Sequence, residues 1–245
     1  MVKIFTTCGP HLEPILEEEL HEMGFKETRQ GYRGVYLEIG EFSDVYKINY
    51  QSRIASRVIY PLDHFKVWDD KTLYKGALKI DWSLYLKVDD TFAIDYSVDH
   101  PSFRNSLYAA QVLKDAICDH FREKEGKRPS VDVANPKVQF HLFIREGWAT
   151  ISLDTSGAPL HKRGYRTEGG DAPLQETLAS ALLKIAKYNK EEIVFDPCMG
   201  SGTFLIEAAL MATNTPPGYL RKKWGFFGHP EFSEEKWLQV KKKHR

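Results

Sequence analysis

The sequence predicts an α+β protein followed by the beginning of an α/β domain. Short strands alternate with amphipathic helices over residues 1–65, and further strands around one long helix fill residues 66–155. An apolar segment, a glycine loop and a second apolar segment then follow one another at 193–210. Because 42% of the 245 residues are hydrophobic, the chain can bury one large core or several smaller ones.

Residues 1–65 are predicted to form a small ferredoxin-like unit. Short strands are predicted at 3–8 and 34–40, with an amphipathic helix at 13–24 between them. A second helix is expected at 43–53 and a longer strand at 55–67. We assign these three strands and two helices to a ferredoxin-like motif, whose full order is βαββαβ.

Residues 66–155 are predicted to form a second α+β unit. Apolar and polar side chains alternate at 91–100, as in a half-buried strand, and 105–121 has helical spacing after a cap at Asn105 or Ser106. Alternation at 138–144 and a returning strand at 148–154 predict a hairpin, with Glu146 and Gly147 in its turn.

The last part of the chain begins with a linker rich in glycine, proline and charge at 156–173. A helix is expected at 171–188, with Asp171 near its cap and Pro173 in its first turn. The apolar face of this helix that packs against the core is predicted to consist of Leu174, Leu178, Leu182 and Ile185. The continuous apolar residues 193–195 predict a strand that is buried on both faces of a parallel sheet.

Composition excludes several classes of function. Lys plus Arg and Asp plus Glu number 34 each, so no global field attracts polyanions and any such site must be a local basic cluster. No apolar run is long enough for a membrane helix, and the N-terminus does not resemble a secretory signal, so a cytoplasmic protein is expected. The three cysteines lie far apart, which argues against disulfides and against a metal site.

The loop at 196–203, "DPCMGSGT", suggests a cofactor. It has no lysine after its glycines, as an ATP or GTP loop requires, and Leu205 stands where a dinucleotide loop needs a third glycine, which disfavours NAD. S-adenosylmethionine carries no phosphate. It would suit Asp196 at a strand end, with Gly200 and Gly202 allowing close backbone approach. A glycine-rich turn without a ligand is the alternative.

Four segments, 161–166, 172–183, 195–213 and 216–226, together resemble the THUMP-domain RNA methyltransferases. The likeness is greatest to the bacterial enzymes that methylate the exocyclic N2 of a guanine in 23S rRNA. It covers essentially the whole chain, because residues 52–62 and 103–121 resemble the ferredoxin-like and THUMP segments of that family.

The resemblance implies three domains. They are a ferredoxin-like domain at 1–65, a THUMP RNA-binding domain at 66–155 that could start as early as 42, and at 156–245 a linker with the first part of an incomplete Rossmann-like class I methyltransferase domain. It also implies S-adenosylmethionine as cofactor and structured RNA, 23S rRNA in particular, as partner. No membrane and no metal are expected.

The resemblance implies two sets of site residues. The first set would form the methionine and ribose side of the cofactor site or lie against it: Asp196, Pro197, Cys198, Gly200, Ser201, Gly202, Thr203, Arg163, Tyr165, Pro173 and Leu174. The second set, chosen as local basic clusters, would contact RNA: Arg104, Lys114, Arg122, Lys124, Lys127, Arg128, Lys162 and Arg166.

Two members of the cofactor set have alternative interpretations. Arg163 and Tyr165 could belong to a plain linker that packs on the domain. Cys198 is expected to be a small packed residue of the loop, because a nucleophile needs a neighbouring base and a substrate face.

The Asn/Asp-Pro-Pro-Tyr type motif, with which this family positions the base, is absent. The segment 214–220, "NTPPGYL", differs because Thr215 separates Asn214 from the prolines and Gly218 precedes Tyr219. No catalytic residue is therefore assigned, and the chain is expected to be the N-terminal portion of the enzyme, inactive alone. The alternatives are a stand-alone RNA-binding module and an adenine-N6 methylase.

Overall fold

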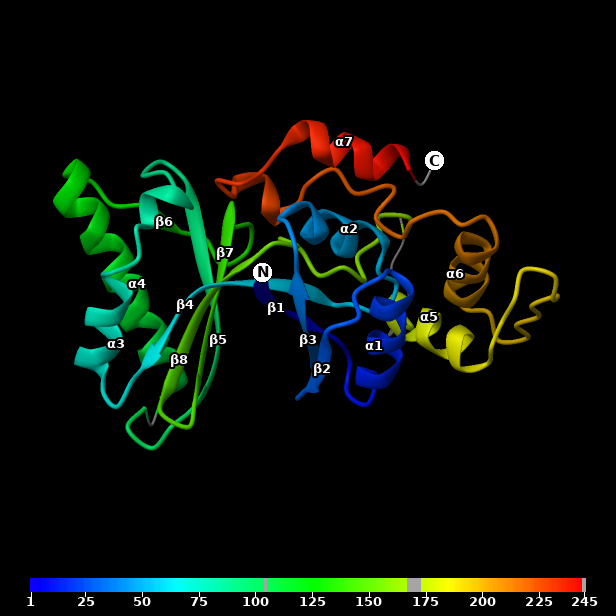
Figure 1. Ribbon diagram of the computed structural model, residues 1–245, viewed down its shortest axis with the longest axis horizontal. Helices are drawn as coiled ribbons and strands as arrows, with labels where there is room; N and C mark the ends of the chain where they lie inside the picture. Colours follow the sequence, from blue (N-terminus) through cyan, green and yellow to red (C-terminus); the bar gives the residue numbers. More distant parts are fainter. Residues whose placement is uncertain (104, 167–172, 244–245) are drawn as a thin grey trace. The chain divides into compact units, whose positions relative to one another are not determined.

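The computed structural model describes residues 1–103, 105–166 and 173–243, which divide into two compact units (Figure 1). Unit 1 comprises Met1–Val58, Ala158–Trp224 and Phe232–Arg245. Unit 2 comprises Ile59–Gly157 and Gly225–Glu231. Segments that lie far apart in the sequence therefore fold together within each unit.

The N-terminal part of unit 1 has the predicted ferredoxin-like elements. Strand β1 (Val2–Thr7) pairs antiparallel with β3 (Gly34–Ile39), which pairs with β2 (Thr28–Gly31). Helices α1 (Glu13–Glu22) and α2 (Ser43–Gln51) accompany these strands. Their apolar faces are buried through Ile4, Leu16, Leu20, Leu37, Val45 and Ile48. The spacing of four between Leu16 and Leu20 puts both on one face of α1, as the sequence pattern predicts.

Three further helices complete unit 1, namely α5 (Glu176–Ile185), α6 (Thr203–Ala212) and α7 (Glu234–Lys242). The Ser233 hydroxyl caps helix α7 by accepting from Lys236 N. It packs on α2. Trp237 lies edge-on to Tyr50 there, with ring centroids 5.3 Å apart.

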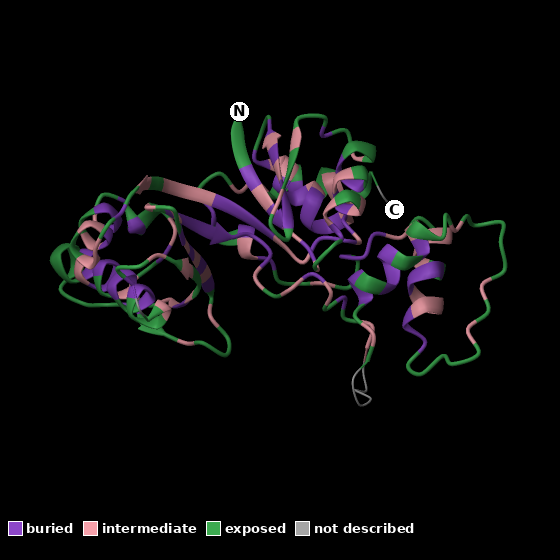
Figure 2. Cartoon of the chain, turned by 90° about the horizontal axis from the view of Figure 1, so that it is seen from below, coloured by how far each residue is buried: buried purple, intermediate pink, exposed green. Residues whose placement is uncertain are grey.

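The strand predicted at 193–195 does not form in the structure. Ile193 is 97% exposed and Phe195 is 84% exposed, and no strand among the described residues pairs with this segment. The chain between α5 and α6 is exposed along most of its length, as its green colour in Figure 2 shows. The prediction was wrong because an apolar run becomes a strand only where a neighbouring strand accepts its backbone hydrogen bonds.

The predicted inward face of α5 was also wrong. The helix begins at Glu176, so Pro173 precedes it, and Asp171 lies outside the described residues. Leu178, Leu182 and Ile185 are exposed, whereas the small residues on the opposite face are buried. Periodicity identifies an apolar stripe but not the surface that covers it, and α5 packs on α6 through its small residues.

Unit 2 is built on a sheet with the strand order β4-β8-β7-β5-β6. The strands, in chain order, are β4 (Arg57–Lys66), β5 (Thr91–Asp99), β6 (Ser130–Val131), β7 (Val138–Arg145) and β8 (Trp148–Asp154). Strand β5 runs parallel to β6 and β7, and the pairs β4–β8 and β7–β8 are antiparallel. The predicted hairpin turn is confirmed, because Glu146 and Gly147 both have positive φ, 52° and 77°.

Two helices, α3 (Asp70–Ala77) and α4 (Ser106–Glu125), pack on this sheet through one apolar core. Asn105 caps α4 as predicted, since its side chain accepts from Leu107 N. Helix α3 was not predicted, although Asp69 and Thr72 form a capping box that marks its start. The shared core contains Leu73, Phe92, Phe103, Leu113, Phe121, Phe140 and Ile151. Among the described helices, none is long and apolar enough to cross a membrane.

Candidate functional site

The loop at 196–203 is a tight turn that leads into α6. Its two glycines adopt left-handed backbone conformations, with φ of 53° at Gly200 and 72° at Gly202. The Asp196 carboxylate accepts a hydrogen bond from Cys198 N at 3.0 Å, and Gly202 N donates to the Met199 carbonyl at 2.8 Å. The loop therefore has a defined backbone although most of its side chains are exposed.

The first turn of α6 presents backbone N–H groups that no side chain caps. Gly202 is the N-cap residue and can offer no side-chain acceptor. These donors and the positive end of the helix dipole suit an anionic or electron-rich ligand group. Since the loop contains no lysine, a bound polyphosphate would lack its usual cation.

A buried ionic network lies behind the loop and centres on Glu207 of α6. Glu207 is fully buried, and its two carboxylate oxygens accept from Ser180 Oγ at 2.6 Å and from Tyr165 Oη at 2.9 Å. Arg163 Nε lies 3.6 Å from the same carboxylate, and only 2% of the Arg163 side chain is exposed. Burial, and then the neighbouring Glu207, raise the pKa of Tyr165, so its phenol stays a hydrogen-bond donor.

The network continues to the far end of α6 through Arg53. Arg163 donates to the Leu160 carbonyl at 2.8 Å and to the Arg53 carbonyl at 2.6 Å. The Arg53 guanidinium donates in turn to Leu210 O at 3.1 Å and to Thr215 O at 2.8 Å. The C-terminal end of α6 is thereby held within unit 1.

Arg166 holds the start of α6. Its guanidinium donates to Leu174 O at 3.1 Å and to Thr203 Oγ1 at 3.0 Å, and it lies 3.3 Å from the Glu176 carboxylate. Thr203 and Glu207 are four residues apart, so they lie on one face of α6. The structure thus brings Arg163, Tyr165, Arg166 and Leu174 together along one helix.

The structure also shows the surroundings of the other residues that the sequence analysis assigns to the cofactor or RNA site. The contacts of Arg166 favour a role in positioning the loop, and its assignment to RNA stays a prediction. Pro173 and Lys162 are exposed, as are Pro197 and Ser201. The expectation that Cys198 is a packed residue was wrong, because its thiol is exposed on a loop that no core of the described residues covers.

Sequence reasoning missed the central residue of the network. Glu207 interrupts the apolar run 204–211, and a single carboxylate within an apolar helix must find partners when it is buried. That interruption is a detectable signal. The partners Ser180 and Arg53 carried no such signal, because nothing in their local sequence distinguishes them from exposed residues.

Three of the five described cations that are predicted to contact RNA in unit 2 are paired with carboxylates. Lys114 pairs with Asp115 at 2.5 Å, Arg122 pairs with Asp119, and Lys124 lies 2.8 Å from Asp81. Lys127 and Arg128 are exposed after the end of α4. Arg104 lies outside the described residues.

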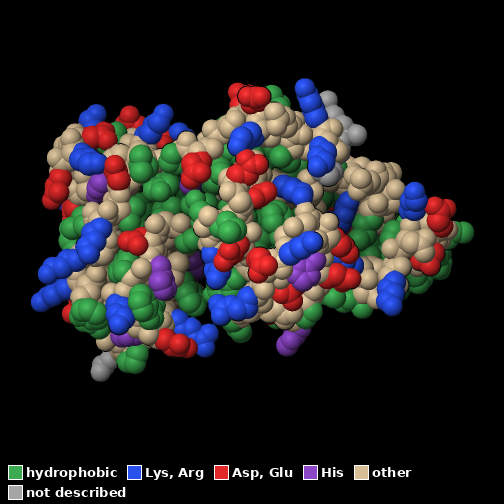
Figure 3. Space-filling model, in the orientation of Figure 1, with side chains coloured by type: hydrophobic (Ala, Val, Ile, Leu, Met, Phe, Trp, Pro, Cys, Tyr) green, Lys and Arg blue, Asp and Glu red, His purple; other side chains and the backbone are tan. Residues whose placement is uncertain are grey.

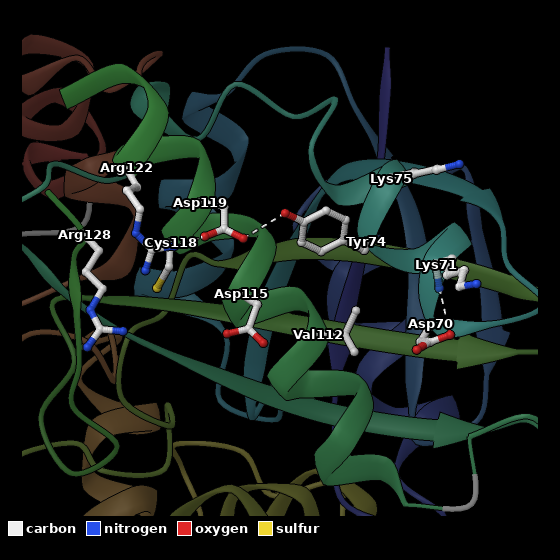
Figure 4. A pocket seen from close by; sticks show the side chains of 10 residues that line it. All are labelled: Asp70, Lys71, Tyr74, Lys75, Val112, Asp115, Cys118, Asp119, Arg122 and Arg128. Atoms are coloured by element: carbon white, nitrogen blue, oxygen red, sulfur yellow. Dashed lines mark hydrogen bonds and ion pairs between the residues drawn. The ribbon is translucent and has the colours of Figure 1, made fainter. Parts of the chain in front are cut away.

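Arg122 and Arg128 line a groove of about 570 Å³ beside α3 and α4 (Figure 4). Three carboxylates, Asp70, Asp115 and Asp119, line the same groove, and Asp119 accepts a hydrogen bond from Tyr74 Oη at 2.8 Å. Cations and carboxylates are likewise interspersed on the face shown in Figure 3. The described part of the chain contains no group of three or more His, Cys, Asp or Glu side chains arranged to hold a metal ion.

Three protein-family models match the chain in succession. The RlmL ferredoxin-like domain matches residues 3–59, the THUMP domain matches 69–154, and the RMKL-like methyltransferase domain matches 163–245. The loop and Glu207 with Arg163, Tyr165 and Ser180 lie within the third match, Arg53 lies within the first, and the groove beside α3 and α4 lies within the second.

Two curated relatives carry the name ribosomal RNA large subunit methyltransferase K/L. The protein from Psychromonas ingrahamii is 42% identical over 98% of this chain and 32% of its own length. The protein from Aliivibrio salmonicida is 40% identical over 100% of this chain and 35% of its own length. The chain thus spans about a third of the length of these relatives.

Solved structures of similar fold cover almost the whole chain. A predicted N6-adenine-specific DNA methylase from Listeria monocytogenes superposes with a TM-score of 0.85 at 26% identity, over 99% of this chain and 63% of its own. The second structure is that of SMU.472, a protein assigned as a methyltransferase and solved in complex with SAH. It superposes with a TM-score of 0.84 at 25% identity, over 99% of this chain and 64% of its own.

Proposed function

Since this chain consists of an RlmL ferredoxin-like domain, a THUMP domain and a segment of an RMKL-like methyltransferase domain, in that order, we propose that it is the RNA-docking and cofactor-loop portion of a large-subunit rRNA methyltransferase. The acceptor atom that we propose is guanine N2 of 23S rRNA. The domain limits predicted from the sequence, 1–65, 66–155 and 156–245, belong to the same proposal. Modification of rRNA would place the protein in the cytoplasm.

The cofactor is S-adenosylmethionine. We assign its methionine and ribose side to the loop 196–203, whose left-handed glycines and uncapped helix start leave the backbone accessible. The observation that carries this assignment is the set of contacts that hold α6: Glu207 is buried with its partners in the middle of the helix, Arg53 holds its end, and Arg166 holds Thr203 at its start, next to the loop. Arg163, Tyr165 and Arg166 are therefore proposed to position the loop from behind.

Structured RNA is the proposed partner, with the THUMP domain as one docking module. Lys127 and Arg128 are the best supported contacts of the predicted set, because both are exposed and neither forms an ion pair with another described residue. Shape and phosphate contacts of this kind orient structured RNA without reading its sequence.

Methyl transfer to guanine N2 requires the amine to be held in line with the sulfonium methyl group, so positioning supplies most of the rate acceleration. The family motif that holds the base is not part of residues 1–245. We therefore propose that these residues bind and orient substrates but do not transfer a methyl group by themselves.

The cofactor assignment is testable in a chimera in which residues 1–245 replace the matching third of the Psychromonas ingrahamii enzyme. Gly202→Val should abolish SAH binding measured by calorimetry, because valine disfavours the φ of 72° on which the loop depends. Gly126→Val is the matched control, since Gly126 has a φ of 70° at the end of α4 in unit 2. Equal SAH affinity of Gly202→Val and the unmodified chimera would contradict the assignment.

A further inference from the structure

Unit 1 contains a basic groove of about 620 Å³ that neither the sequence patterns nor the family likeness assigns to a ligand. Five cationic side chains line it, and they come from segments far apart in the sequence: Lys47, Arg53, Lys184, Lys187 and Lys243. Lys47 lies on α2, Lys187 follows the end of α5, and Lys243 ends α7. The fold gathers these charges, whereas the whole chain has no net charge.

The carboxylates of the groove neutralise few of these cations. Glu19 is buried and already accepts from Ser52 Oγ at 2.6 Å and from the backbone N–H groups of residues 53 and 54. Glu22 pairs with Lys184 at 2.7 Å. Glu18 is the remaining acid of the lining. Among the described residues, Lys47, Lys187 and Lys243 therefore form no ion pair, although the Asp44 carboxylate acts on Lys47 electrostatically.

Two of the cations are held where an anion would stabilise them. Lys47 donates to the Met23 carbonyl, and burial, followed by the nearby positive charge of Lys243, lowers its pKa. Nη1 of Arg53 is buried and has no hydrogen-bond partner among the described residues. An anion in the groove would offset the repulsion between the two lysines.

Lys187 adds a backbone observation. It has a φ of 56° and occupies the position after the C-cap of α5, where Lys187 N donates to Lys184 O at 2.9 Å and Tyr188 N donates to Leu183 O at 3.0 Å. This pair of bonds is the Schellman motif, in which the left-handed position is usually glycine. A lysine there costs about 1 kcal/mol relative to glycine, so its side chain occupies this site at the expense of helix stability.

We propose that this groove binds the phosphodiester backbone of RNA through Lys47, Lys187 and Lys243. Flexible ammonium groups act as point charges and suit phosphates that carry no sequence information. Three such groups line a groove of about 620 Å³, which is larger than a single phosphate, so the groove has room for more than one phosphate of a strand. The inference rests on the proposed RNA function and gives unit 1 its own part in docking.

The test measures binding of a structured large-subunit rRNA fragment to the chain over a range of salt concentrations. Lys187→Gly and Lys187→Ala should each weaken binding and reduce the slope of log affinity against log salt by about 1. Lys187→Arg should preserve both quantities. Lys187→Gly should melt at or above the temperature of the unmodified chain, because glycine favours the left-handed position.

Lys26→Gln is the matched control, since Lys26 is exposed in unit 1 but does not line the groove. An unchanged salt slope for Lys187→Gly would overturn the inference and leave the proposed function standing. Failure of the unmodified chain to bind the RNA would overturn both. Binding of inorganic phosphate alone that Lys187→Gly abolishes, together with an unchanged RNA salt slope in that variant, would overturn the backbone assignment in favour of a free-phosphate site.

Discussion

Removal of the Glu207 carboxylate should be among the most destabilising single changes in unit 1. Glu207→Ala deletes the acceptor of Ser180 Oγ and Tyr165 Oη and leaves the Arg163 guanidinium buried without its carboxylate. Removing one partner of a buried ion pair typically costs about 3–5 kcal/mol, because the remaining charge stays out of water. We expect the free energy of unfolding of unit 1 to fall by that amount.

Urea unfolding followed by tryptophan fluorescence measures this loss, since Trp224 and Trp237 both lie in unit 1. Glu41→Ala is the matched control: Glu41 pairs with Lys236 at 2.5 Å on the surface, and such pairs contribute below about 1 kcal/mol. The double change Arg163→Met with Glu207→Leu should recover only the part of the loss that comes from the unpaired buried charge, because Ser180 Oγ and Tyr165 Oη still lack their acceptor. If Glu207→Ala costs no more than Glu41→Ala, the network does not fix α6 as argued.

Further predictions concern thiols, pH and RNA. In the folded chain Cys198 should react rapidly with iodoacetamide and Cys8 should not, because burial raises the pKa of Cys8 to about 12; equal rates would contradict this. Burial lowers the pKa of His229 to about 4, so the unfolded chain binds a proton below pH ~6.5 that the folded chain does not. As the pH falls from ~6.5 to ~4, the free energy of unfolding should therefore decrease by up to about 1.4 kcal/mol per pH unit. His229→Gln should flatten this pH dependence, measured by urea unfolding at each pH. Arg128→Glu should weaken salt-sensitive rRNA binding, whereas unchanged binding would remove Arg128 from the docking surface.

Much of the fold could be predicted from local sequence pattern. The ferredoxin-like order, the cap at Asn105 and the turn at Glu146 and Gly147 depend on residues close together in the chain, and the structure has all three. The helix that follows Gly202 is equally local, because a glycine pair followed by an apolar run specifies where it begins.

The predictions that were wrong share a different cause. Each depended on which other segment of the chain packs against the element, and the local sequence does not specify that segment. Ile193 and Phe195 are exposed since no neighbouring strand pairs with them, and Leu182 faces solvent since α5 packs through its small residues. The network at Glu207 joins residues more than 100 positions apart, such as Arg53 and Arg163, so pattern reasoning could find its carboxylate but not its partners.

The most direct test of the proposed function is methyl transfer by the chimera of residues 1–245 with the remainder of the Psychromonas ingrahamii enzyme. We expect tritium transfer from labelled S-adenosylmethionine to unmodified large-subunit rRNA, with N2-methylguanosine as the product, and none from residues 1–245 alone. Transfer that yields N6-methyladenosine, or turnover by residues 1–245 above a blank without enzyme, would contradict the account.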